Sequence, residues 1–159
     1  MRDDLQQTLY DTFPDLYWQH TLPMEESCMY AGITCDDGWY DIIYKLSEAI
    51  TAIIAKDPEL DPKTYSVCQV KEKLGGLRFY ILRWNDDIHK AIHAAERESF
   101  KTCERCGKPG ELRTTGWLRT LCDECEEARQ ARQAERRRRA NRHFPLFSSF
   151  HFFKFWRAE

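Results

Sequence analysis

Two pairs of cysteines have the spacing of a metal-binding module. Zinc prefers four ligands in a tetrahedron, and thiolates suit it well. Each pair has two residues between its cysteines, and Gly107, directly after the first pair, permits the left-handed backbone that such a turn often needs. Because four cysteines leave no position open for water, the pattern predicts one structural zinc ion, Zn2+, in a zinc ribbon. The predicted ligands are Cys103, Cys106, Cys122 and Cys125.

The segment between the two cysteine pairs supports this interpretation. Its sequence LRTTGWLRTL is typical of two short strands that turn near Thr115-Gly116, and such a hairpin would bring the pairs together. Two disulfides or four unrelated thiols are the alternative. Redox catalysis by either pair is disfavoured, because neither pair lies in the βαβ context of a thioredoxin-like motif.

An arginine-rich segment follows the cysteines and is the strongest signal for a binding partner. Guanidinium groups pair with phosphates and stay charged at working pH. Next to a zinc ribbon they favour nucleic acid as the partner, with one aromatic side chain stacking on a base. The alternatives are a solvated basic helix that balances the acidic body, or an acidic protein surface as the partner. The candidate nucleic-acid contacts are Trp117, Arg129, Arg132, Arg136, Arg137, Arg138, Arg139 and Arg142.

Three further cysteines have no paired spacing. Cys28, Cys35 and Cys68 are expected to be buried thiols that act as small apolar side chains. A second metal site built from Cys28, Cys35 and His20 is the alternative interpretation.

A pair of histidines occurs at helical spacing. His89 and His93 lie four residues apart on a predicted helix and share a face, flanked by Asp86 and Glu96. A metal site or an acid–base pair could be built there. A solvated helix face is the favoured interpretation, because these residues lie opposite the apolar stripe of the same helix.

Recognisable catalytic motifs are absent from the sequence. There is no GxSxG, no HExxH and no phosphate-binding glycine-rich loop. Asp36, Asp37 and Asp41 could serve a metal-dependent nuclease. A simpler interpretation is that Asp36 or Asp37 caps a helix whose dipole favours Asp41 in the first turn. We therefore expect a binding protein and not an enzyme.

Two helices are predicted in the part of the chain before the cysteine module. Apolar residues at helical spacing predict the first over about 38–56, ended by Pro58. The second follows Asn85 or Asp86, either of which can cap it. Its apolar stripe consists of Ile88, Ala91, Ile92, Ala95 and Phe100.

A β-hairpin is predicted between these helices. Alternating apolar and polar residues on both sides of Gly75-Gly76 are typical of two strands joined by a tight turn. Because two strands alone are marginally stable, a third strand is expected from residues 25–35. Residues 1–100 therefore predict a small α+β body of the helix–β-hairpin–helix type.

Charge is divided unevenly along the 159 residues. Residues 1–100 carry 18 acidic against 10 basic side chains, whereas residues 101–159 carry 14 basic against 8 acidic ones. This asymmetry indicates an acidic body and a basic tail. The first residues are acidic and unlike a secretory signal, and no window reaches the ~18 continuous apolar residues of a membrane span. We expect a cytoplasmic, reduced protein, in which paired cysteines usually hold metal.

Three parts of the chain follow from these patterns. Residues 1–100 form the α+β body, residues 101–126 the appended four-cysteine zinc ribbon, and residues 127–159 a basic helix with an aromatic-rich tail. The tail's apolar side chains could fold back, form a homodimer, enter a partner's groove or contact a membrane surface. They are Phe144, Leu146, Phe147, Phe150, Phe152, Phe153, Phe155 and Trp156.

Three sequence blocks together resemble a known family. CMYAGITCDDGWYDII, QVKEKLGGLRFYI and TCERCGKPGELRTTGWLRTLCDEC resemble an uncharacterised family of small proteins from bacterial genomes, prophages and phages, over about residues 20–126. The resemblance implies a cytoplasmic protein with a zinc-binding C-terminal segment and a phage-related context, and it brings no settled activity. It also supports an alternative function, a protein-binding inhibitor or adaptor such as an anti-CRISPR-like counter-defence protein that acts on a nucleic-acid-binding host complex.

Overall fold

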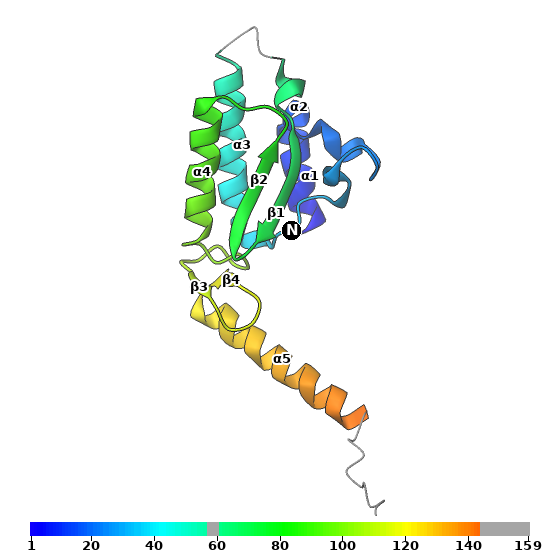
Figure 1. The fold of residues 1–159 in the computed structure, drawn as a ribbon, viewed down its shortest axis with the longest axis vertical. Helices are drawn as coiled ribbons and strands as arrows, with labels where there is room; N and C mark the ends of the chain where they lie inside the picture. The colour runs from blue at the N-terminus through cyan, green and yellow to red at the C-terminus, as the bar shows by residue number, and fades with distance from the viewer. Residues whose placement is uncertain (57–60, 144–159) are drawn as a thin grey trace, which may run out of the picture. The chain divides into compact units, whose positions relative to one another are not determined.

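The computed structural model describes residues 1–56 and 61–143, with side chains described up to residue 140 (Figure 1). The chain divides into two compact units, Met1–Glu126 and Glu127–Glu159. The predicted aromatic tail, and with it the proposed homodimer contact, lies outside the described residues. None of the helices in the described part of the chain has both the length and the apolar character needed to cross a bilayer.

The two predicted helices are present and pack against each other. α3 spans Tyr40–Ile54 and is preceded by a 3-10 turn, η3 (Asp37–Trp39), while α4 spans Asp86–Ser99. Figure 1 shows them side by side at one side of the first unit. Their apolar stripes are buried in one core, to which the hairpin also contributes. The buried stripe residues are Ile42, Ile43, Leu46, Ile50, Ile54, Ile88, Ile92 and Ala95.

The predicted hairpin is also present. β1 (Val67–Lys73) and β2 (Gly76–Ile81) run antiparallel, with Val70 opposite Phe79 and a register irregularity near the start of β1. The two turn residues, Leu74 and Gly75, have φ values of 56° and 80°, which suits the type I′ turn favoured in two-residue hairpins. The buried side chains of the hairpin are those of Val67, Val70, Leu77 and Phe79.

The N-terminal segment covers the other side of the hairpin (Figure 1). α1 (Asp3–Thr12) stops before Pro14, which opens the short α2 (Pro14–Tyr17), and the 3-10 turns η1 (Trp18–Thr21) and η4 (Pro62–Tyr65) complete this side. Proline at the first position of a helix lacks only a hydrogen bond that would be missing there anyway. The buried residues Leu9, Phe13, Leu16 and Tyr17 join the same core as the hairpin and α3.

The prediction of a third strand over residues 25–35 is wrong, because only an isolated bridge forms there. Residues 28–31 form a 3-10 turn, η2 (Cys28–Ala31), and only Thr34 bridges to β1. The Thr34 amide donates to the Val70 carbonyl at 3.0 Å, and its carbonyl accepts from the Glu72 amide at 3.1 Å. A longer strand would need the amides of Gly32 and Asp36 to donate to β1 as well. The Gly32 amide instead donates to the Met29 carbonyl at 2.9 Å, and the Asp36 amide donates to Glu104 Oε1 at 3.2 Å.

The expected aspartate cap of α3 is also wrong, whereas the cap of α4 is confirmed. Neither Asp36 nor Asp37 caps α3 through its side chain. The carboxylate of Asp37 accepts from the Arg2 backbone amide at 2.7 Å and pairs with its guanidinium at 2.9 Å. Asn85 does cap α4, because its Oδ1 accepts from the Ile88 amide at 2.9 Å.

This cap gives a first prediction. Asn85→Ala should lower the free energy of unfolding by about 1 kcal/mol, because the Ile88 amide loses its acceptor at the start of α4. Asn85→Asp keeps an acceptor there and should stay within a few tenths of a kcal/mol of the parent. Urea unfolding followed by circular dichroism measures both variants. Equal stability of the two variants would contradict the role of the cap.

Candidate metal centre

The four predicted ligands converge in space. Their sulfur atoms all lie within 4.8 Å of one another, and the Sγ atoms of Cys106 and Cys122 are 3.6 Å apart. Four sulfurs around a zinc ion at ~2.3 Å would be about 3.8 Å apart, so the donor set fits tetrahedral coordination. All seven cysteines are free thiols, which argues against the disulfide alternative. The cluster can therefore hold a metal ion.

Two different local structures present the sulfurs. The first pair lies on a tight turn, in which the Gly107 amide donates to the Cys103 carbonyl at 2.9 Å and Gly107 has a φ of 76°. In the second pair, Cys122 directly precedes α5 (Asp123–His143) and Cys125 lies in the first turn of that helix. Between them, β3 (Glu111–Arg113) and β4 (Arg119–Leu121) form the predicted antiparallel hairpin. The convergence of the four cysteines and the hairpin that joins the two pairs are therefore as the sequence predicted.

The pKa values of the thiols are shifted in opposite directions within the cluster. A backbone hydrogen bond from Cys125 lowers the pKa of the Cys122 thiol and favours its thiolate. Burial raises the pKa of Cys106 and Cys125, because a desolvated thiolate in this cluster lacks a compensating charge. A divalent cation supplies that charge and deprotonates its thiol ligands.

Backbone contacts join the first cysteine pair to the start of α3. The Gly38 amide donates to the Glu104 carbonyl at 2.7 Å, and the indole of Trp39 donates to the Thr102 carbonyl at 2.8 Å. Trp39 is fully buried, so its side chain links the core of the body to the segment that carries the metal ligands. The cysteine module and the body consequently form one compact unit, Met1–Glu126.

A buried carboxylate adds a second connection that sequence reasoning missed. Glu104, between the cysteines of the first pair, is fully buried, and its Oε1 accepts from Arg119 at 3.0 Å and from the Asp36 amide at 3.2 Å. Burial is the main cause that raises the pKa of Glu104. Thr120 donates to the Gly75 carbonyl at 2.6 Å beside it. The only sequence signal for the buried role of Glu104 is its position between the two cysteines of a CxxC pair.

The alternative site of Cys28, Cys35 and His20 is not formed. Within the described residues, the four-cysteine cluster is the one group of at least three such ligands that comes together. The His20 ring stacks on Tyr10 with centroids 4.1 Å apart, and its Nδ1 lies 2.8 Å from the Tyr17 carbonyl. Of the unpaired cysteines only Cys35 is buried, and burial raises its pKa to about 12.

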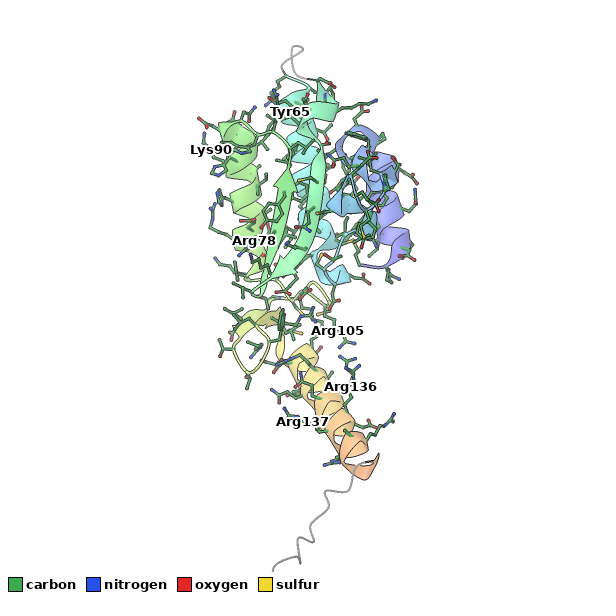
Figure 2. All side chains as sticks on the ribbon, turned by 45° about the vertical axis from the view of Figure 1, so that its right-hand side comes forward. Tyr65, Arg78, Lys90, Arg105, Arg136 and Arg137 are labelled. Carbon is green, nitrogen blue, oxygen red and sulfur yellow. The ribbon has the colours of Figure 1, made fainter. Side chains whose placement is uncertain are left out.

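The candidate nucleic-acid contacts belong to two separate units. Trp117 is 71% exposed in the first unit, where its indole donates to the Glu72 carboxylate at 3.3 Å. The arginines lie on α5 in the second unit, and Figure 2 shows Arg136 and Arg137 projecting from that helix. Arg139 pairs with Glu135 at 2.7 Å. The Arg142 side chain lies outside the described residues.

Comparisons with known proteins add no further assignment. No family model matches the chain, and no curated protein or solved structure is significantly similar to it.

Proposed function

We propose that this protein is a non-enzymatic zinc-ribbon protein that binds nucleic acid through the arginines of α5. The four-cysteine cluster supports the metal part of the proposal, and zinc is the ion that an all-thiolate tetrahedral site suits best. Because every ligand is a protein thiolate, the ion would be structural. The nucleic-acid part rests on the distribution of charge along α5.

Four arginines of α5 form a stripe along one side of the helix. Residues 129, 132, 136 and 139 follow one another at intervals of three, four and three, so their side chains share a face. We call these four residues the arginine stripe. The ten residue-to-residue steps from Arg129 to Arg139 correspond to about 15 Å of helix. Arg132, Arg136 and Arg139 are exposed, and Arg129 is half-buried.

The composition of α5 favours a polyanionic partner. Between residues 128 and 140 the helix has six arginines, a single glutamate, and otherwise alanine and glutamine. It therefore has no apolar stripe to pack on a protein core. Like charges one turn apart repel each other along the helix, and phosphates lying against the stripe would relieve that repulsion. The arginine stripe is the observation on which this proposal depends.

Salt dependence tests the stripe directly. Replacing Arg132, Arg136 and Arg139 together with glutamine should weaken nucleic-acid binding at least tenfold in ~0.1 M salt. The slope of log affinity against log salt should fall by about 2 to 3, because each phosphate contact contributes ~0.7 for single strands and ~0.9 for duplex DNA. Fluorescence anisotropy with labelled single-stranded and duplex oligonucleotides measures both quantities.

A matched variant separates charge from helix structure. Replacing the same three arginines with lysine keeps the charge and should keep most of the salt slope. Circular dichroism should show equal helix content in the glutamine and lysine variants. If the glutamine variant binds as tightly as the parent, the arginine stripe is not the binding surface.

The acidic body supports a second candidate function, a protein-binding inhibitor or adaptor. The acidic excess of residues 1–100 could imitate nucleic acid and occupy a basic groove of a host complex. The resemblance to prophage and phage proteins fits such a role in the bacterial cytoplasm. Native mass measurement of the protein purified from cells distinguishes the candidates. One stoichiometric protein partner would favour the inhibitor, whereas retained nucleic acid would favour the arginine stripe.

A further inference from the structure

The outer face of α4 carries two histidines whose ring nitrogens face each other. The Nε2 atoms of His89 and His93 share a hydrogen bond of 2.9 Å, and their rings are perpendicular with centroids 4.2 Å apart. Both residues are exposed. Helical spacing alone would place them on one face, but it would not require their Nε2 atoms to converge.

We infer that His89 and His93 form a chelating site for a divalent transition metal of the nickel and copper class. Imidazole nitrogen binds such metals at ~2.0 Å to ~2.1 Å. Two nitrogens at neighbouring positions, 90° apart around the ion, are then about 2.9 Å from each other, whereas tetrahedral positions would place them about 3.4 Å apart. The observed separation matches the 90° positions of square-planar or octahedral coordination, the geometries of Cu2+ and Ni2+.

The groups around the pair favour the required tautomer. Nδ1 of His93 lies 3.7 Å from the Glu96 carboxylate, which favours a proton on that nitrogen. The Nε2 lone pair of His93 then accepts the hydrogen bond from His89 and is the one that would bind a metal ion. A carboxylate behind a metal-binding histidine is a common arrangement that orients the ring. In the hydrogen bond between the two rings, the proton then lies on Nε2 of His89. When the ion binds, that proton moves to Nδ1 of His89, so the neutral pair releases no net proton.

Other neighbours leave the site open. Trp84 stacks on the His89 ring with centroids 4.8 Å apart and restricts its orientation. Lys90 projects from α4 in Figure 2, and its ammonium group pairs with Asp87 at 3.3 Å. No third ligating side chain of the described residues reaches the pair, so water would fill the remaining coordination positions. This nitrogen site is chemically distinct from the thiolate cluster.

Nickel binding to the zinc-loaded full chain tests the inference. One Ni2+ should bind per chain beyond the zinc, and it should quench Trp84 fluorescence, since the indole stacks on one of the ligands. The double variant His93→Ala/Ala94→His has the same composition but places the imidazoles five residues apart, on different faces of α4. Its nickel affinity should be at least tenfold lower by equilibrium dialysis.

Two controls make the outcome decisive. Trp84→Phe should abolish most of the quenching, while its nickel affinity stays within about threefold of the parent. Thiolate-to-nickel charge-transfer absorption would reveal nickel entering the cysteine cluster. The inference is overturned if the wild type shows no saturable nickel binding, if the double variant binds equally well, or if binding always brings thiolate absorption.

Discussion

Replacing Cys103 with serine should destabilise the whole unit Met1–Glu126 and not only the cysteine module. A structural zinc ion contributes its binding energy to folding, and a neutral hydroxyl is a poor replacement for a thiolate ligand. Loss of the ion would also release the segment that accepts the hydrogen bonds of Gly38 and Trp39. We expect a loss of at least about 3 kcal/mol in unfolding free energy, and a drop in Tm of about 10 °C or more.

Near-ultraviolet circular dichroism measures this effect, because the buried Trp39 connects the body to the metal-binding segment. Chelation of the parent protein should lower its Tm as Cys103→Ser does. Cys28→Ser is the matched control, since Cys28 is exposed and lies outside the cluster, and it should change stability by less than about 0.5 kcal/mol. If Cys103→Ser keeps both its zinc content and its Tm, the cluster has no structural role.

Local patterns in the sequence were sufficient to predict most of the elements and the cysteines that come together. The stripe of α3 repeats with the helical period, and Asn85 is an ordinary cap residue for α4. The CxxC spacing determines the geometry of each cysteine pair locally, because with only two residues between them both sulfurs can be presented from one tight turn. Such features depend on neighbours within about four residues, which are visible in the printed sequence.

Features that depend on distant residues were not predictable in the same way. Asp37 is a reasonable cap by sequence, but its carboxylate pairs with Arg2, which lies 35 positions earlier. The third strand does not continue past Thr34 because the Asp36 amide donates to the Glu104 side chain, 68 positions later. Glu104 became a buried link only through Arg119 and Asp36. Each outcome is a competition for one hydrogen bond, and the sequence does not show which donor lies nearby.

Gly38→Ala should be the most damaging glycine-to-alanine substitution where the start of α3 contacts the turn of the first cysteine pair. A Cβ at position 38 would lie 2.2 Å from the Cys103 carbonyl oxygen, 2.4 Å from the Gly107 nitrogen and 2.6 Å from the Cys106 nitrogen. All three atoms are backbone atoms of the turn that carries the first cysteine pair. A side chain could rotate away, but this turn can move only by leaving α3 or by distorting the metal ligands.

We expect Gly38→Ala to cost about 3 kcal/mol or more, at the upper end of overpacking effects. Gly116→Ala is the matched control, because nothing lies within 4 Å of a Cβ there, and only its φ of 79° opposes the methyl group. That strain should cost about 1 to 2 kcal/mol. Urea unfolding of both variants, with zinc content measured in parallel, separates the two effects. If Gly38→Ala is no less stable than Gly116→Ala, the turn of the first cysteine pair can move away from position 38 without cost. The tight packing at Gly38 would then not be required for stability.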